Sequence, residues 1–436
     1  MSQTMNTTHG SEEPSQPLVP KLRFPEFRDA GEWTTITLGS AVRISSEKVG
    51  EHKCIPMSIT SGVGLVSQME KFGRIIAGSS YANYLLLKRD DFAYNKSSTK
   101  EFPEGFIALY AGESLAAVPN SIFTCFRTNS ESLLPKYLNY LFLGNLHGTW
   151  LRQFIEVGAR AHGSLSINDA DLLALPVPVP QGTNTLPEQA RIADCLSSLD
   201  ELLAAQARKV EALKTHKKGL MEQLFPREGE TQPRLRFPEF RDAGEWVETT
   251  LERACTATIT YGIVQAGPNV PDGVPYIKST DVNAPLYLKR LSRTSEEIAR
   301  KYRRSEVAPG DVVISLRGNL GVAQIVPSSI PVANLTQGTA RIRTASNPAF
   351  YHYMLQSEAI RSVLTALGKG STFQEISLAA LRTLRIKQPE PPEQRRIADC
   401  LSSIDDLIAA QTRTHEALKT HKKGLMQQLF PSPSLD

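Results

Sequence analysis

The chain has 436 residues, 41% hydrophobic and 22% charged, so it can bury sizeable cores and form two or three structural units. It contains no run of eighteen apolar residues, and residues 1–20 lack the basic start and apolar middle of a signal peptide, so we expect a cytoplasmic protein with a disordered leader. The formal net charge of +4 is too small to indicate nucleic-acid binding by itself.

The first ordered part begins with RFPEFRDAGEW at residues 23–33, followed by a region of short elements up to residue 186. β-branched runs predict strands at residues 91–96 and 121–126, and residues 135–154 are predicted to be helical. Asn168 is predicted to cap a short helix, after which a proline-rich strand leads onward.

A long helix is predicted over residues 187–226, because Pro187 suits the first turn and Glu188 faces the positive end of the helix dipole. A stripe with alternating spacings of four and three residues follows, which is typical of a coiled coil. Its polar positions are Gln206 and Lys217, which we expect to fix the register. The apolar positions of this stripe are Ile192, Leu196, Leu199, Leu203, Val210, Leu213, Leu220 and Leu224.

The second half repeats this frame. RFPEFRDAGEW recurs unchanged at residues 236–246, and residues 187–226 recur nearly unchanged at 392–431, with the polar positions Gln411, His415 and Lys422. The second stripe contains Ile397, Leu401, Ile404, Ile408, Leu418, Leu425 and Leu429. One stripe alone could belong to a helical hairpin, but two matching stripes can pair with each other in an antiparallel coiled coil.

The regions between the frames, residues 34–186 and 247–391, share almost no sequence. Strands are predicted at 273–280, 310–316, 321–326 and 338–344, a helix at 350–367, and a short helix capped by Ser377. The second region carries +6, against +1 for the first. Much of this charge lies in a cluster that we interpret as a solvated helix face: Arg300, Lys301, Arg303 and Arg304.

The predicted fold class is therefore α/β, with two mixed α/β domains separated by two long antiparallel coiled-coil helices in a pseudo-two-fold tandem repeat. The expected boundaries are a leader at 1–20, a first mixed α/β domain at 21–186, a helix at 187–226, a linker and second mixed α/β domain at 227–391, a helix at 392–431 and a tail at 432–436. Simple domain doubling fits less well, because both halves would then diverge evenly.

The chain resembles the specificity subunits of type I restriction-modification systems from residue 21 to 431. The motifs that carry this resemblance are LPEQ at 186–189, PPEQ at 391–394, GDVVISLRG at 310–318 and GSTFQEIS at 370–377. The resemblance implies two domains that each read one half of an interrupted double-stranded DNA site. It also implies docking to two methyltransferase (modification) subunits that carry S-adenosylmethionine, and to restriction/translocase subunits that use ATP and Mg²⁺.

Polar turn residues beside strands are the candidate DNA contacts, because Arg, Lys, Asn and Gln are the usual base readers. In the first domain these are Asn95, Lys96, Ser97, Arg160 and His162; in the second they are Lys278, Arg317, Asn319, Gln337, Lys369, Ser371, Thr372 and Gln374. Ordinary surface or turn chemistry remains the alternative for each of them.

No catalytic role is expected for this chain. It lacks a glycine-rich cofactor loop and an Asn/Asp-Pro-Pro-aromatic motif, and GKGST at 368–372 lacks phosphate-loop spacing. The five scattered cysteines include no C-x-x-C pair, so neither a metal site nor bound cofactor is expected. A structural coiled-coil scaffold and an orphan DNA-binding adaptor for another defence system remain alternative functions.

Overall fold

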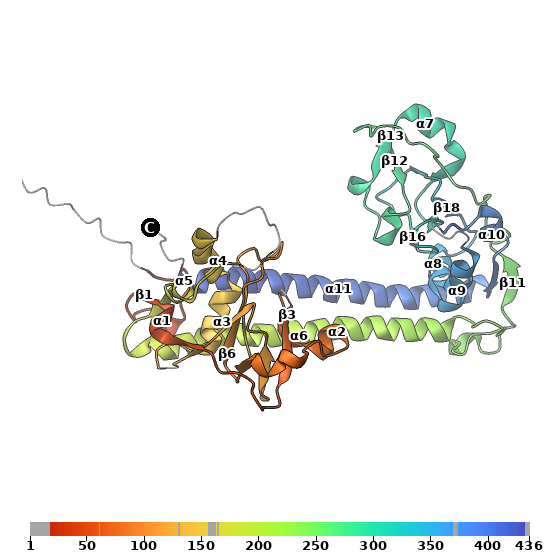
Figure 1. The fold of residues 1–436 in the computed structure, drawn as a ribbon. Coiled ribbons are helices and arrows are strands. Elements are labelled where there is room, and N and C mark those ends of the chain that lie inside the picture. Colours follow the sequence, from red (N-terminus) through yellow and green to blue (C-terminus); the bar gives the residue numbers. More distant parts are fainter. Residues whose placement is uncertain are drawn as a thin grey trace, which may run out of the picture. The chain divides into compact units, whose positions relative to one another are not determined.

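The computed structural model describes residues 18–60, 62–129, 131–155, 163, 165–368 and 374–431. The chain divides into two compact units, each described here by itself: unit 1 is Met1–Ala205 with His415–Asp436, and unit 2 is Gln206–Thr414. Each unit contains one part of both long helices, α6 (Thr185–Leu224) and α11 (Pro391–Leu429), labelled in Figure 1. Within the described residues, no helix is long and apolar enough to cross a membrane.

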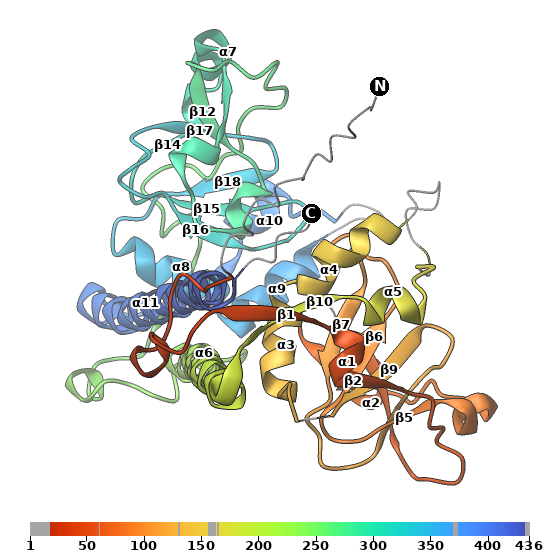
Figure 2. The same cartoon turned by 90° about the vertical axis from the view of Figure 1, so that its left-hand side faces the viewer.

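Unit 1 combines three small sheets with short helices. Its four-stranded sheets have the orders β2-β9-β6-β7 and β4-β3-β8-β5, and β1 pairs antiparallel with β10. Helix α3 lies against β7 (Figure 2). The strands are β1 (Trp33–Thr37), β2 (Val42–Ser45), β3 (Ile55–Thr60), β4 (Gly64–Ser67), β5 (Leu85–Leu87), β6 (Asp91–Asn95), β7 (Phe106–Leu109), β8 (Ala116–Val118), β9 (Phe123–Thr128) and β10 (Pro176–Pro180). The short helices are η1 (Pro25–Phe27), α1 (Leu38–Ala41), α2 (Gln68–Phe72), η2 (Ser79–Asn83), α3 (Pro135–Leu143), α4 (Leu146–Leu151), η3 (Arg152–Phe154), α5 (Asp169–Leu173) and η4 (Gly182–Asn184).

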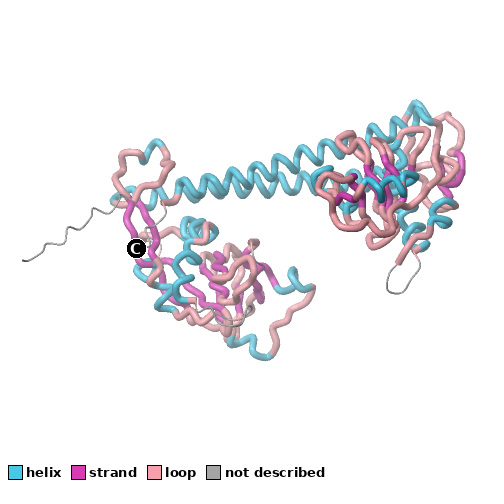
Figure 3. The backbone as a smooth tube through the Cα atoms, turned by 90° about the horizontal axis from the view of Figure 1, so that it is seen from above, coloured by secondary structure: helices cyan, strands magenta, loops and turns pink. Residues whose placement is uncertain are grey.

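Unit 2 has a similar plan, with sheet orders β13-β12-β17-β14 and β16-β15-β18 and an antiparallel β11-β19 pair. Figure 3 shows strands interleaved with helices in each unit, so the predicted mixed α/β class is confirmed. The strands are β11 (Val247–Thr250), β12 (Val274–Ile277), β13 (Ser292–Thr294), β14 (Glu306–Val307), β15 (Val312–Ser315), β16 (Ala323–Ile325), β17 (Ala333–Leu335), β18 (Thr339–Ile342) and β19 (Arg385–Gln388). The short helices are η5 (Pro238–Phe240), η6 (Asp281–Asn283), η7 (Leu288–Arg290), α7 (Glu296–Lys301), η8 (Arg303–Ser305), α8 (Pro348–Gln356), α9 (Glu358–Leu367) and α10 (Leu378–Arg382).

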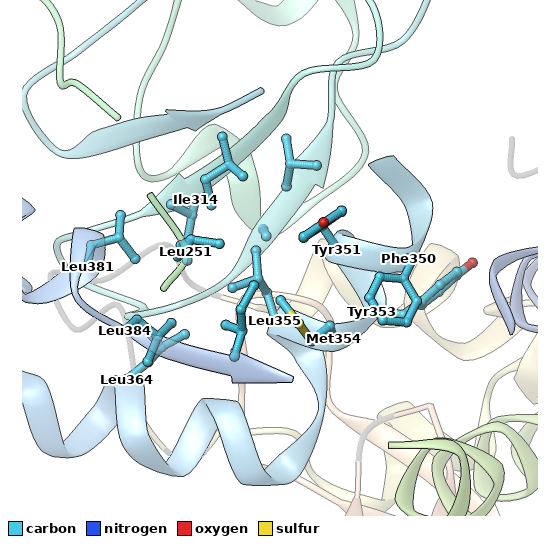
Figure 4. Close-up of a cluster of buried hydrophobic side chains, with 14 of the residues drawn as sticks. Leu251, Ile314, Phe350, Tyr351, Tyr353, Met354, Leu355, Leu364, Leu381 and Leu384 are labelled. Atoms are coloured by element: carbon cyan, nitrogen blue, oxygen red, sulfur yellow. The ribbon is translucent and has the colours of Figure 1, made fainter. Parts of the chain in front are cut away.

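The main core of unit 2 joins β15, β18 and helices α8 to α10. Figure 4 shows Leu251, Ile314, Phe350, Leu364 and neighbouring apolar side chains converging there, and these four are fully buried. Removing each large apolar side chain from water stabilises the fold by roughly 1.5–3 kcal/mol. This packing therefore fixes the position of β15 and β18 against the helices.

Two predicted helices are interrupted in the structure. The helix expected at 350–367 divides into α8 and α9 at Ser357, which has extended backbone angles and whose buried Oγ donates to the Met354 carbonyl oxygen. The helix expected at 135–154 divides after α3, where Asn145 adopts a positive φ of 67°. The long helices begin at Thr185 and Pro391, slightly earlier than predicted. Tertiary packing therefore overrides the simple helical periodicity at these points.

Candidate nucleic-acid interface

A buried ion pair joins the start of each long helix to the repeated RFPEFRDAGEW segment. In unit 1, Arg23 Nη2 lies 2.7 Å from Glu188 Oε2, and their side chains are 8% and 1% exposed. Trp33 Nε1 donates to Glu188 Oε1 at 3.3 Å. Arg236 and Glu393 form the same pair at 2.7 Å in unit 2. From the sequence, these glutamates are expected only to face the positive end of a helix dipole. Their presence at equivalent positions of both copies, together with Arg23 and Arg236, could have indicated the ion pair.

The same segment also reaches the far end of a long helix within each unit. The backbone N–H of Leu22 donates to the Gln428 carbonyl oxygen at 3.0 Å, and that of Leu235 donates to the Gln223 carbonyl oxygen at 2.9 Å. Phe430 packs in the unit 1 core with Tyr137, their ring centroids 5.5 Å apart. The repeated segment thus makes equivalent contacts in the two units, with the end of α11 in unit 1 and with the end of α6 in unit 2.

A second repeated group fixes the long helices to the globular part of each unit. In unit 2, Lys217 Nζ lies 2.6 Å from Asp405 Oδ1 and 4.8 Å from the Tyr353 ring centroid. The Tyr353 hydroxyl donates to Asp405 Oδ2 at 2.7 Å. Burial raises the pKa of Tyr353 above its ordinary value, so the phenol remains protonated and able to donate. The equivalent group in unit 1 consists of Lys422, Asp200 and Tyr140.

The side chains of the two predicted stripes are buried or half-buried along α6 and α11. Gln206 Nε2 donates to Gln411 Oε1 at 2.7 Å and to its backbone oxygen at 3.0 Å, so two of the polar stripe positions contact each other. The apolar stripe positions, all buried or half-buried, are Ile192, Leu196, Leu199, Leu203, Val210, Leu213, Leu220, Leu224, Ile397, Leu401, Ile404, Ile408, Leu418, Leu425 and Leu429.

Arg317 and Gln337 come together at the ends of β15 and β18. Arg317 Nη1 donates to Gln337 Oε1 at 3.5 Å, and Arg317 Nη2 lies 3.0 Å from Glu375 Oε2. Both members of this ion pair are 42% exposed, so water screens the interaction and it contributes roughly 0–1 kcal/mol. An incoming ligand could therefore replace Glu375 as the partner of the guanidinium at little cost.

The other described candidates of unit 2 have different partners. Asn319 is exposed and its Nδ2 donates to Asn283 Oδ1 at 3.2 Å. Lys278 is half-buried and its Nζ donates to Ser292 Oγ at 2.9 Å. Gln374 is exposed and precedes Glu375 in the chain. Thus Asn319 and Gln374 are exposed to solvent, whereas the half-buried Lys278 already contributes to packing.

In unit 1, Asn95, Lys96 and Ser97 form a half-buried turn at the end of β6. Asn95 Oδ1 accepts a hydrogen bond from the Ser97 backbone N–H at 3.0 Å, which is ordinary turn chemistry. The Lys96 backbone N–H donates to the Ile122 carbonyl oxygen at 2.9 Å. The remaining candidates, Arg160, His162, Lys369, Ser371 and Thr372, lie outside the described residues.

The basic cluster of unit 2 is not one helix face. Arg300 belongs to α7 and lies 3.8 Å from Glu296, whereas Arg303 and Arg304 belong to η8 and line a cavity. The same cavity is lined by Arg341 and other arginines that the sequence reasoning missed. The TARIRT run at residues 339–344 could have indicated two of them, because Arg341 and Arg343 are two positions apart and alternate residues of an extended chain face the same side.

The fold and the duplicated frame define a two-unit α/β protein, and residues 256–420 match the type I restriction modification DNA specificity domain. The chain is 26% identical over 330 residues to a Methanocaldococcus jannaschii protein named as the type I restriction enzyme MjaX specificity subunit, covering 75% of this chain and 74% of that protein. It is 30% identical over 159 residues to the EcoBI specificity subunit of Escherichia coli, covering 35% and 33%. A chain in a solved structure of a type I restriction-modification system shares the fold, with a TM-score of 0.55, 17% identity and coverage of 92% and 98%.

Residues 256–420 therefore match a type I restriction modification DNA specificity domain, and the chain is similar to type I specificity subunits over three quarters of its length, as its motifs predicted. In the described part of the chain, no group of three His, Cys, Asp or Glu side chains could hold a metal ion.

Proposed function

We propose that this chain selects an interrupted, asymmetric double-stranded DNA site for partner enzymes and performs no chemistry itself. Residues 21–186 would read one half-site and residues 227–391 the other, with helices 187–226 and 392–431 pairing as the spacer. The observation that carries this proposal is the contrast between near-identical frames and unrelated inserts. Such a contrast suits one shared scaffold that presents two different readers.

For the second half-site we assign Arg317 and Gln337 as the first candidates for base contacts. Arginine reads guanine and glutamine reads adenine through paired hydrogen bonds in the major groove. Their mutual contact and the exposed, exchangeable pair with Glu375 support this choice. The remaining candidates in both domains keep the roles expected from the sequence, with phosphate contacts as the alternative role for the lysines.

The repeated helices offer a docking surface for two copies of one partner. Leu202 and Leu407 occupy equivalent repeat positions, are 48% and 43% exposed, and each directly follows an acidic residue. Some exposed residues of these helices also match in the two copies, such as Arg208 with Arg413, whereas Glu201 corresponds to Asp406. We propose that each leucine contacts one modification subunit, which would carry S-adenosylmethionine; restriction subunits would supply ATP- and Mg²⁺-dependent steps.

The decisive experiment exchanges residues 34–186 for the equivalent region of another family member. The chimera and the original chain are each co-expressed with the modification subunit, and methylated adenines are mapped across the host genome. We expect one half of the methylated motif to change, while the other half and the gap stay the same. A change in both halves would contradict separate readers, and exchange of residues 247–391 serves as the reciprocal control.

The alternative functions predict different results. A structural scaffold would show no sequence-dependent DNA binding, and an orphan adaptor would bind DNA without a methyltransferase partner. Incubating the purified chain with DNA, S-adenosylmethionine, ATP and Mg²⁺ tests for activity of its own, and any turnover would defeat the adaptor proposal. For docking, Leu202→Glu should reduce the bound modification subunits from two to one, whereas Leu143→Glu, another exposed leucine outside the repeat, should not.

A further inference from the structure

Unit 2 contains a cavity of about 600 Å³ whose lining is dominated by arginine. It lies between β14, β18 and α10, which Figure 2 labels in one part of the unit. Five arginines line it, with Glu306 as the acidic lining residue: Arg303, Arg304, Arg341, Arg343 and Arg382.

Two of these arginines already have acidic partners. Arg343 makes a two-pronged contact with Asp311, with both N–O distances at 2.6 Å. Arg382 Nη2 donates to the Ile259 carbonyl oxygen at 2.6 Å, and its Nε lies 3.5 Å from Glu252 Oε1. These two side chains line the cavity, but most of their hydrogen-bonding capacity and charge is already satisfied.

The other three arginines leave an excess of positive charge. Arg341 is 9% exposed; its Nη1 donates to the Glu306 backbone oxygen at 2.6 Å, but its buried Nε has no hydrogen-bond partner within the described residues. Arg303 and Arg304 are exposed, and neither has an ion-pair partner within 4.0 Å in the part of the chain that the structure describes. Arg341 lies on β18 and Arg343 directly follows the last residue of this strand, so the alternation of an extended chain places both on the same side.

A buried guanidinium with an unused N–H is costly, because arginine cannot shed its proton to escape burial. Burial lowers the pKa of Arg341, and repulsion by Arg343 lowers it further. Asp311 is already committed to Arg343, so it does not offset the charge of Arg341 fully. An oxyanion in the cavity would accept a hydrogen bond from the Nε donor and offset part of the excess positive charge.

Unit 1 provides an internal comparison. Its Arg127–Asp91 pair, which lies on β9 and β6, corresponds to the Arg343–Asp311 pair, whose residues directly flank β18 and β15. However, Cys125 pairs with Ala93 where Arg341 pairs with Val313, and Cys125 is fully buried. The last residue of α5 is Leu173, where α10 ends with Arg382. The arginine cavity is thus an addition to the second reader and accounts for much of its larger positive charge.

We propose that the cavity formed by Arg303, Arg304 and Arg341 binds a phosphate group, and that the group comes from the backbone of bound DNA. The choice of DNA rests on the proposed function, because the cavity belongs to a DNA specificity domain. A phosphate held there fixes the position of the second reader on the duplex without reading sequence, leaving base choice to other residues.

The test compares the full-length chain with its Arg304→Gln and Arg300→Gln variants. Arg304 is exposed, so its replacement leaves the buried core intact; Arg300 is an exposed neighbour that does not line the cavity. DNA affinity is measured by fluorescence anisotropy across a salt series, with duplexes that contain or lack the methylated motif. Arg304→Gln should weaken binding about 3- to 10-fold on both duplexes and reduce the log–log salt slope by about 0.9, as expected for one lost phosphate contact, while Arg300→Gln should preserve the slope.

A second arm uses inorganic phosphate alone, with chloride at equal ionic strength as the reference, and follows thermal unfolding of the three proteins. Stabilisation by phosphate that Arg304→Gln abolishes, with an unchanged DNA salt slope, would support the phosphate site but assign it to a free phosphate. An unchanged slope together with no phosphate-specific stabilisation would overturn the proposal. If the original chain binds both duplexes equally well, the proposed function is wrong. The thermal unfolding measurements with inorganic phosphate still test whether the cavity binds phosphate.

Discussion

The buried pair of Arg236 and Glu393 should be one of the most sensitive points of unit 2. Their side chains are 8% and 3% exposed, so neither charge can regain much water if the other is removed. Replacing Arg236 with Met leaves a buried carboxylate facing an apolar side chain. Loss of one partner from such a pair typically costs about 3–5 kcal/mol.

That cost can be converted into a melting temperature. For a unit of about 200 residues, 1 kcal/mol shifts the Tm by roughly 2–4 °C, so Arg236→Met should lower it by roughly 6–20 °C. The double variant Arg236→Met with Glu393→Met removes both charges. It should recover most of the lost stability, because apolar replacement of a complete buried pair is often neutral or stabilising.

Urea unfolding combined with hydrogen exchange, read separately from peptides of each unit, measures the effect. Arg385→Met is the matched control, because Arg385 pairs with Glu248 in the same unit with side chains that are 78% and 44% exposed. This exposed pair should contribute less than about 1 kcal/mol. Equal losses from Arg236→Met and Arg385→Met would refute the reasoning, as would failure of the double variant to recover stability.

Three further outcomes are expected. Burial lowers the pKa of His147 from 6.5 to about 4, so between pH 6.5 and pH 4 the unfolded chain binds more protons than the folded chain. The free energy of unfolding of unit 1 should therefore fall by about 2 kcal/mol between pH 7 and pH 5, and His147→Gln should abolish most of this pH dependence in urea unfolding. Tyr353→Phe removes the hydroxyl that donates to Asp405 and should destabilise unit 2 by about 1–3 kcal/mol, whereas Tyr140→Phe should affect unit 1; hydrogen exchange that shows the reverse pattern would contradict the assignment. A fragment of residues 1–226, purified with the modification subunit, should form a dimer that methylates an interrupted palindrome of the first half-site; a monomer by native mass measurement would show that the halves are not equivalent.

The repeated frame was predictable because its information is local or duplicated. The heptad spacing located α6 and α11, and the exact return of RFPEFRDAGEW is matched by the equivalent backbone contacts of Leu22 and Leu235. Helix breaks were less predictable. Ser357 ends α8 because its hydroxyl and backbone angles cap the turn, a choice that depends on packing around it.

The arginine cavity shows the limit of sequence reasoning at the site. Arg304, Arg341 and Arg382 are far apart in the chain and meet only because η8, β18 and α10 pack in one unit. The free Nε of Arg341 depends on which carbonyl oxygens its neighbours present, which no spacing rule encodes. By contrast, the cluster near residue 300 was visible as charge, but its division between α7 and η8 was not.

The composition of unit 1 also bears on how the protein is synthesised. Its core joins Ile192 and Leu196 to Leu429, so the unit needs residues from both ends of the chain. At 5–20 residues per second, a ribosome takes roughly 10–40 s to make the stretch between Ala205 and His415. During that time the Ile192 and Leu196 side chains of α6 lack the Leu429 side chain that completes their core. Unit 1 can therefore close its core only after the residues that follow unit 2 in the sequence have been translated.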